Sequence, residues 1–177
     1  MIDPDSAAIR PARPADLGAI HALIRDLARY ERLDHLCTGS SDELGDALFG
    51  PDPAAQVLVA VSGEEIVGFA LFFTTFSTFL ARRGTWLEDL YVRPEHRGAG
   101  IGARLLRAVA AVAVERGSGR FEWSVLDWNA PAIGFYERLG ATVLPDWRIA
   151  RVTGEALATL ARPERSGTGG NGETSGP

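Results

Sequence analysis

The sequence contains no lysine, a single cysteine and only three histidines. The absence of lysine excludes both the lysine of a phosphate-binding P-loop and a catalytic lysine Schiff base. The lone cysteine, Cys37, has no internal disulfide partner, which fits a reducing compartment, so we expect a cytoplasmic protein. The histidines are His21, His35 and His96. Because they lie far apart in the chain, no metal-ligand cluster is predicted and we expect no metal.

Long apolar runs and an excess of positive charge are also missing. No uninterrupted apolar stretch approaches the ~18 residues that a membrane-spanning helix needs. The N-terminus lacks the basic start and apolar core of a secretory signal, so we expect no membrane partner. The formal net charge of −5 argues against a nucleic-acid partner. A length of 177 residues, 46% hydrophobic and 23% charged, is typical of one globular domain.

The spacing of apolar residues divides the chain into alternating strands and helices. Strands are predicted at 8–10, 57–61, 66–75, 85–92, 121–125 and 142–152. Helices are predicted at 14–32, 40–50, 102–116 and 129–140, the second opened by a capping box of Ser40 and Glu43 and the last by Asn129. This alternation indicates an α/β fold on one mixed sheet. We expect a single domain over residues 1–162 and a disordered tail over 163–177, which is rich in Gly, Ser and Thr and has no apolar anchor.

A glycine-rich run, RGAGIG at positions 97–102, lies between a predicted strand and a predicted helix. Its glycines let the backbone approach a ligand closely, and the following helix adds unpaired N–H groups and the positive end of its dipole. This arrangement suits a phosphate or pyrophosphate; a tight turn that only connects two elements is the alternative. A dinucleotide-binding turn is not favoured, because the spacing is G-x-G-x-G and no acidic residue ends a following strand as required.

Three ordered segments resemble the GNAT N-acetyltransferase superfamily: LEDLYV at 87–92, RGAGIG at 97–102 and NAPAIGFYERLGA at 129–141. The second matches the pyrophosphate loop of that family, Arg/Gln-x-x-Gly-x-Gly/Ala. Within the family, the chain is more similar to the spermidine/spermine (diamine) and thialysine N-acetyltransferase group. This likeness adds RYE at 29–31, DWN at 127–129 and WR at 147–148, and it covers residues 8–162. It implies the GNAT fold, with a mixed, mostly antiparallel central sheet flanked by helices on both faces.

The resemblance implies acetyl-CoA as co-substrate. Backbone groups of the strand at 85–92 would bind the pantetheine and the thioester carbonyl, and the glycine run would hold the pyrophosphate. Asn129 and Tyr136 would contact the coenzyme from the following helix, although Asn129 also has a structural explanation as an N-cap. The implied coenzyme-binding residues are Leu90, Tyr91, Val92, Arg97, Gly98, Ala99, Gly100, Ile101, Gly102, Asn129 and Tyr136.

Acyl transfer from a thioester to an amine needs a group that accepts the amine proton and a group that protonates the departing thiolate. The resemblance makes Glu88 the candidate base, with a surface carboxylate as the alternative. It makes Tyr136 the candidate acid, since a phenol keeps its proton at neutral pH; a core tyrosine is the alternative. Asp89 follows Glu88 and points to the opposite face of the strand unless a bulge intervenes. The family has a bulge near this point.

Three acidic residues are candidates for binding a cationic substrate: Glu31, Glu88 and Asp89. Trp128 is the candidate cation–π partner, although tryptophans more often only pack. Mammalian polyamine enzymes have an acidic residue where Thr78 aligns in this sequence. Its absence weakens the case for long polyamines and leaves shorter diamines, thialysine-like amino acids or another primary amine.

Three functions are consistent with these residues. The first is an acetyl-CoA-dependent N-acetyltransferase that moves an acetyl group to a primary amine of a small cationic substrate (a diamine, polyamine or thialysine-like molecule). The reaction would proceed by direct attack in a ternary complex, and the family implies a homodimer. The second is a GNAT enzyme that acts on a peptide, protein or antibiotic amine. The third is a non-catalytic acyl-CoA-binding module, against which the presence of both Glu88 and Tyr136 speaks.

Overall fold

The structure, a computed structural model, describes residues 7–163. Within them, five strands form one sheet in the order β1-β2-β3-β4-β5. The strands are β1 (Ala8–Pro11), β2 (Gln56–Ser62), β3 (Glu65–Ser77), β4 (Arg82–Val92) and β5 (Phe121–Trp123). The helices are α1 (Leu17–Tyr30), α2 (Ser41–Phe49), α3 (Ile101–Glu115), α4 (Ala130–Arg138) and α5 (Gly154–Leu160), with short 3-10 turns at η2 (Pro14–Asp16), η3 (Asp34–Leu36) and η4 (Pro94–His96).

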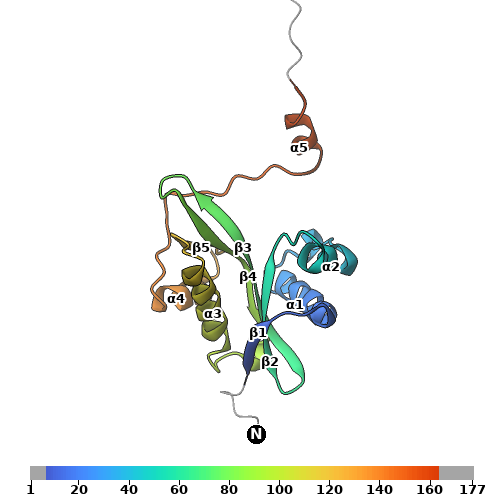
Figure 1. Cartoon of the computed structure of the whole chain (residues 1–177), viewed down its shortest axis with the longest axis vertical. Coiled ribbons are helices and arrows are strands. Elements are labelled where there is room, and N and C mark those ends of the chain that lie inside the picture. Colours follow the sequence, from blue (N-terminus) through green and yellow to red (C-terminus); the bar gives the residue numbers. More distant parts are fainter. Residues whose placement is uncertain (1–6, 164–177) are drawn as a thin grey trace, which may run out of the picture.

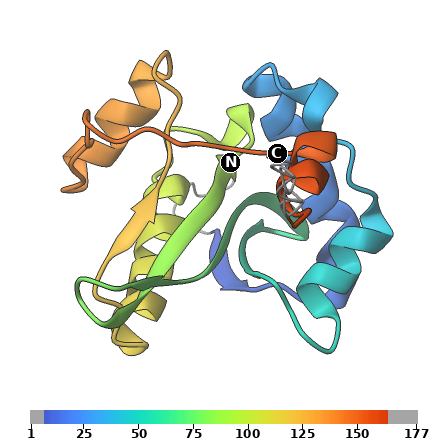
Figure 2. The same cartoon turned by 90° about the horizontal axis from the view of Figure 1, so that it is seen from above.

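Helices cover both faces of the sheet. α1 and α2 pack on one face, and α3 and α4 pack on the other (Figures 1 and 2). Strands β1 to β4 pair antiparallel with their neighbours, whereas β4 and β5 are parallel. This confirms the predicted α/β fold with a mixed, mostly antiparallel sheet. None of the helices in residues 7–163 is long and apolar enough to span a membrane.

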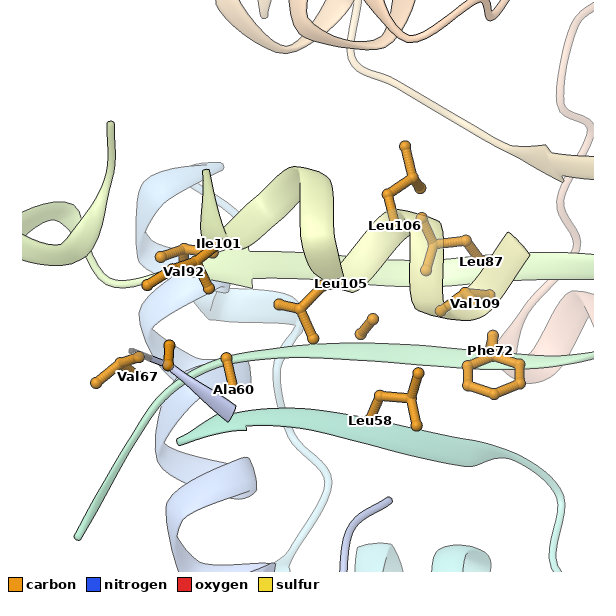
Figure 3. Close-up of a cluster of buried hydrophobic side chains, with 12 residues drawn as sticks. Leu58, Ala60, Val67, Phe72, Leu87, Val92, Ile101, Leu105, Leu106 and Val109 are labelled. Atoms are coloured by element: carbon orange, nitrogen blue, oxygen red, sulfur yellow. The ribbon is translucent and has the colours of Figure 1, made fainter. Parts of the chain in front are cut away.

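Strand β3 supplies apolar side chains to both faces of the sheet. Val67 and Phe72 belong to the buried cluster beneath α3, whereas Ile66 and Phe69 belong to the cluster beneath α1. Figure 3 shows the first cluster, in which Leu105 of α3 is fully buried over the sheet. Burial of a side chain of this size stabilises the fold by roughly 1.5–3 kcal/mol. A strand covered on both faces has a nearly continuous apolar sequence, which is why this segment was predictable as one strand.

An ion pair ties the start of α1 to β1. The carboxylate of Asp16, which is 9% exposed, accepts hydrogen bonds from the Arg10 guanidinium at 2.6 and 2.9 Å and from the backbone N–H of Arg13 at 2.7 Å. The hydrogen bonds from Arg10, more than any other contact, hold the pKa of Asp16 below its usual value. This anchor fixes α1 at its first turn, and the other end of α1 reaches the cleft described below.

Two predicted helix caps are confirmed. Ser40 Oγ accepts from the backbone N–H of Glu43 at 3.2 Å, and the Glu43 carboxylate accepts from the backbone N–H of Ser40 at 2.8 Å. Asn129 Oδ1 accepts from the backbone N–H of Ala132 at 3.3 Å and so caps α4. Each cap satisfies N–H groups that a first helical turn leaves unpaired. The second cap also fixes the helix on which Tyr136 lies.

The predicted strand at 142–152 is wrong. The structure has an irregular segment there, followed by α5, and every residue from 142 to 163 is exposed. A strand must pair its backbone N–H and C=O groups with a neighbouring strand, and within residues 7–163 this segment pairs with none. It runs away from the sheet instead (Figure 1). Residues 164–177, most of the predicted disordered tail, lie outside the described residues.

Candidate active site

A cleft opens where β4 and β5 stop pairing. The parallel register ends at Leu87 and Trp123, whereas β4 continues to Val92. The strand predicted at 121–125 therefore ends two residues early, and Ser124, Val125 and Leu126 form the far wall of the cleft. On this side, residues 88–92 have no strand partner among residues 7–163, so the backbone groups that face the cleft are available to a ligand, except the Val92 carbonyl, which accepts a hydrogen bond from Arg97. The cleft is lined by Tyr30, Glu31, Glu88, Asp89, Leu90, Tyr91, Val92, Arg97, Gly98, Gly100, Ile101, Gly102, Asn129, Phe135 and Tyr136, among others.

The glycine-rich loop lies at the start of α3 and lines this cleft. Gly98 and Gly100 have φ angles of +82° and +75°, which side-chain-bearing residues rarely adopt, and Gly100 is the N-cap of α3. The first N–H groups of α3 have no partner within the helix and, with the helix dipole, favour an anion. Ala99 is the exception among the predicted loop residues, because it packs against the core cluster beneath α3 instead of lining the cleft.

Arg97 is held at the edge of the cleft by two aromatic rings. Its guanidinium lies 4.9 Å from the ring centroid of Tyr30 and 5.4 Å from that of Tyr91. Its Nε donates a hydrogen bond to the carbonyl oxygen of Val92 at 2.8 Å. The remaining guanidinium N–H groups are the donors that suit a phosphate oxygen.

A β-bulge at the two acidic residues of β4 interrupts the regular alternation of side chains between the faces of the strand. Asp89 pairs with Leu71 and Leu87 pairs with Phe72, so Glu88 is the extra residue. Both carboxylates therefore line the cleft, as the family resemblance implied. Their surroundings differ, because the Glu88 side chain is exposed and accepts a hydrogen bond from the indole N–H of Trp86 at 2.9 Å, whereas Asp89 is half-buried.

Asp89 lies in a cluster with Glu31 and Tyr136. Burial, followed by the negative charges of Glu88 and Glu31, raises the pKa of Asp89 to about 7. Burial also raises the pKa of Glu31. Within residues 7–163, no cationic side chain and no hydrogen-bond donor pairs with the carboxylate of Asp89 or Glu31. The arrangement is an acidic pocket that a cationic ligand would complete.

Tyr136 lies on α4, lines the cleft and has its ring in an aromatic cluster. Its ring centroid is 4.9 Å from that of Trp123 and 5.1 Å from that of Phe135. Burial, with the charges of Glu31 and Asp89, raises the pKa of Tyr136 to about 12. The phenol therefore holds its proton throughout the neutral range, which a proton donor requires.

Asn129 joins the start of α4 to the end of α1. It is 7% exposed, and its Oδ1 accepts from the hydroxyl of Tyr30 at 3.3 Å in addition to capping α4. Sequence reasoning included Tyr30 only as part of the RYE segment and assigned it no role. Its position directly before the acidic Glu31, at the end of an amphipathic helix, was the available signal.

Trp128 lies outside the cleft lining. It is 53% exposed, with its ring 6.2 Å from that of Tyr30 and the guanidinium of Arg32 5.9 Å from its centroid. The structure therefore brings together every predicted site residue except Trp128 and Ala99. Phe135 and residues 124–126 also line the cleft and were not predicted. No group of three or more His, Cys, Asp or Glu side chains that could hold a metal ion occurs in the described part of the chain.

Comparison with known proteins identifies the family of this chain. The model of the acetyltransferase (GNAT) family matches residues 20–141, which include the β4 segment, the glycine loop and α4. This chain belongs to the GNAT family. It is an acetyl-transferring enzyme, so the non-catalytic acyl-CoA-binding module is set aside. GNAT enzymes use acetyl-CoA as co-substrate.

Similar proteins include amine acetyltransferases of animals and plants. The thialysine N-epsilon-acetyltransferase of Mus musculus is 39% identical over 88% of this chain and 98% of its own length. The L-ornithine N5-acetyltransferase NATA1 of Arabidopsis thaliana is 34% identical over 86% of each chain. A spermidine/spermine N(1)-acetyltransferase-like protein of Homo sapiens is 32% identical over 88% of this chain and 24% of its own length.

Solved structures share the same fold. An integron cassette protein from the mobile metagenome of V. cholerae superposes with a TM-score of 0.75 and 25% identity, covering 89% of this chain and 99% of that one. An aminoglycoside acetyltransferase from a soil metagenome superposes with a TM-score of 0.70 at 20% identity, over 83% of this chain and 95% of that one. At this identity the second likeness concerns the fold alone.

Proposed function

We propose that this GNAT enzyme transfers the acetyl group of acetyl-CoA to a primary amine of a small cationic molecule, a diamine or a thialysine- or ornithine-like amino acid. The amine attacks the thioester directly while both substrates are bound. The observation on which this rests is the acidic pocket of Glu31 and Asp89, because an unpaired pair of half-buried carboxylates in a cleft favours a cationic ligand.

The coenzyme occupies the other half of the cleft in this proposal. Its pyrophosphate lies on the N–H groups of the loop at 97–102, with Arg97 as a charged donor. Its pantetheine runs along the free backbone edge of Leu90, Tyr91 and Val92, where the strands have separated. The thioester then lies beside Tyr136 and the acidic pocket.

Every proton in the proposed reaction has an acceptor. The amine enters as an ammonium ion and passes one proton to a carboxylate of the cleft, where Glu31, Glu88 and Asp89 are all available. Its lone pair attacks the carbonyl carbon, the C–N bond forms, and the C–S bond breaks as its electrons pass to sulfur. The thiolate takes a proton from Tyr136, which is reprotonated by the second proton of the nitrogen. The products are the amide, the free thiol and one proton.

The named relatives favour a small acceptor over a peptide or an antibiotic. Their names specify thialysine and L-ornithine, both small amino acids with a side-chain amine. Thr78, where the mammalian polyamine enzymes have an acidic residue, lies exposed in the turn between β3 and β4 and does not line the cleft. Acetylation of a peptide, protein or aminoglycoside amine remains the second candidate, and the experiment below includes both.

We also propose that the enzyme acts as a homodimer. The segment from 142 to 163 extends from the sheet and is exposed throughout (Figure 1). Its large apolar side chains are exposed by 42% to 76%. An apolar surface of this kind on a water-soluble chain favours contact with another protein surface. The side chains concerned are Val143, Leu144, Trp147, Ile149, Val152, Leu157 and Leu160.

The function is tested by following free-thiol release from acetyl-CoA with purified enzyme and separate amines. The panel holds thialysine, ornithine, lysine, putrescine, spermidine, an aminoglycoside and a short peptide. We expect turnover with at least one of the small diamines or diamino acids. Turnover with the aminoglycoside or the peptide alone would replace the proposed acceptor with the second candidate. Binding of acetyl-CoA without turnover of any amine would contradict the proposal.

A further inference from the structure

The exposed carboxylate of β4 already has a partner in the protein. Glu88, the bulged residue, accepts the indole N–H of Trp86, and its side chain faces solvent at the rim of the cleft. An exposed carboxylate of this kind can attract a cation toward the cleft, but water screens its charge.

Asp89 differs from Glu88 in three ways. It resumes the paired register opposite Leu71, so the backbone position of its carboxylate is fixed by the β3–β4 ladder. It is half-buried in the cleft, and within residues 7–163 no donor satisfies its oxygens. It also lines the same cleft as Tyr136, and its negative charge contributes to the raised pKa of that phenol.

Charged and titratable side chains from several elements surround Asp89. From its own strand, Glu88 adds negative charge, and Glu31 at the end of α1 adds more. From α4, Tyr136 presents a neutral phenol. Cationic groups also line the cleft, but Arg97 is held between two rings. The titratable and charged side chains of the cleft are Tyr30, Glu31, Glu88, Asp89, Tyr91, His96, Arg97, Tyr136 and Arg138.

We infer that Asp89, rather than the adjacent Glu88, is the catalytic residue that accepts the proton of the substrate ammonium, and that Glu31, the other unpaired carboxylate of the acidic pocket, is a positioning residue for this transfer. The inference rests on the proposed function. The ammonium N–H bond breaks as the proton passes to a carboxylate oxygen of Asp89, and the freed lone pair forms the C–N bond to the acetyl carbon. After release of the thiol and the amide, Asp89 returns this proton to solvent.

A pKa of about 7 for Asp89 suits this role. A general base is most effective when its pKa lies near the working pH, because it is then both ionised and able to hold the proton. Near pH 7 about half of the free enzyme has Asp89 ionised. The value of kcat/KM reports the ionisation of the free enzyme, so it should rise with pH and level off above about pH 7.

The test compares Asp89→Asn with Glu88→Gln over a pH series, with the best amine of the panel as substrate. Asp89→Asn is expected to lower kcat/KM at neutral pH by roughly 100- to 10,000-fold. Its rate should then climb with pH toward the pKa of the free amine, about 10, since only amine already deprotonated in solution can react. Glu88→Gln removes a charge from the rim of the cleft, so it should lower kcat/KM less than Asp89→Asn does, and its profile should still level off near pH 7.

Two further variants separate the proton-accepting role from a structural one. Asp89→Glu keeps a carboxylate and should restore part of the rate and the levelling of the profile. Glu31→Gln removes a negative neighbour, so the pKa of Asp89 should fall and the rise of kcat/KM should move to lower pH. Binding of acetyl-CoA and the thermal unfolding midpoint, measured for each variant, show whether the fold is retained.

Three outcomes would overturn the inference: a fully active Asp89→Asn enzyme, an Asp89→Asn profile that still levels off near pH 7, or loss of that levelling in Glu88→Gln. These outcomes differ from failure of the proposed function, in which the wild-type enzyme itself turns over no amine of the panel.

Discussion

Burial decides what the titratable side chains of the cleft can do. Removal from water favours the neutral form of an acid, and nearby negative charge adds to this preference. The same two causes therefore raise the pKa of Asp89 to about 7 and that of Tyr136 to about 12. At neutral pH the cleft holds a carboxylate that is ready to take a proton and a phenol that has one to give. Because Asp89 can be ionised while Tyr136 is protonated, the first can act as the proton acceptor and the second as the proton donor.

Removal of the Tyr136 hydroxyl should affect turnover and spare binding. Tyr136→Phe keeps the ring contacts with Trp123 and Phe135, and within residues 7–163 the hydroxyl makes no hydrogen bond that the fold would lose. We expect kcat to fall by roughly 10- to 1000-fold, since the thiolate then leaves without its proton donor. The Kd for acetyl-CoA, measured by calorimetry, should stay the same. An unchanged kcat would remove Tyr136 from the mechanism.

Helix α3 has a glycine with a positive φ angle at each end. Gly100 at its start and Gly117 just beyond its end have φ angles of +75° and +68°, and an added Cβ would meet open space at both positions. Backbone strain from a side chain is therefore similar at the two ends. Only Gly100 lines the cleft, where its backbone is proposed to lie against the pyrophosphate.

The pair Gly100→Ala and Gly117→Ala separates these two effects. Each substitution should lower the free energy of unfolding by about 1–2 kcal/mol, measured by denaturant titration, because alanine is strained at positive φ. Only Gly100→Ala should also weaken acetyl-CoA binding, by roughly 10- to 100-fold, as loss of hydrogen bonds to a charged group predicts. Equal coenzyme affinity in both variants would contradict the assignment of the loop.

Most of the fold and most residues of the cleft could be predicted from the sequence. The elements of the core were predictable because their apolar residues follow the period of the helix or form the continuous run of a doubly covered strand, as in β3. The loop at 97–102 was predictable because glycine spacing is itself the signal. The bulge at Glu88 was expected from the family resemblance alone, since nothing in the composition of the strand requires it.

Other features depend on contacts that a linear pattern does not contain. Glu88 and Asp89 are adjacent and similar, and only the folded structure shows that the first is exposed and the second is half-buried in the cleft. Trp128 was expected at the substrate, yet the fold directs its ring to Tyr30 and Arg32. The strand at 142–152 was predicted from its apolar residues, but no strand of the described chain lies beside it.

At the scale of the whole molecule, residues 142–163 form an extension whose apolar side chains do not pack against the sheet. β5 is a three-residue strand at the edge of the sheet, and the chain beyond α4 does not pair with it. Trp147 and Ile149, on this extension, are 76% and 64% exposed. Such residues are costly to leave in water, and a second subunit is the cover that we propose.

Substitution of Trp147 and Ile149 by serine should therefore shift the enzyme from dimer to monomer. Sedimentation velocity on the wild type and the double variant measures this directly. Two other exposed apolar residues, Phe76 near the end of β3 and Phe79 in the turn that follows, provide the control: Phe76→Ser with Phe79→Ser changes surface hydrophobicity in general and should leave the dimer intact. A monomeric wild type at micromolar concentration would contradict the proposed assembly.

A competition experiment tests the central claim, acetylation of a small cationic amine, most directly. Limiting acetyl-CoA is mixed with equal concentrations of thialysine, ornithine, putrescine, spermidine, an aminoglycoside and a peptide, and the acetylated products are identified by mass spectrometry. Product ratios then report the ratios of kcat/KM. We predict that the acetyl group is found on a small diamine or diamino acid and that Asp89→Asn abolishes this product at neutral pH. Acetyl groups found only on the peptide or the aminoglycoside would contradict the account.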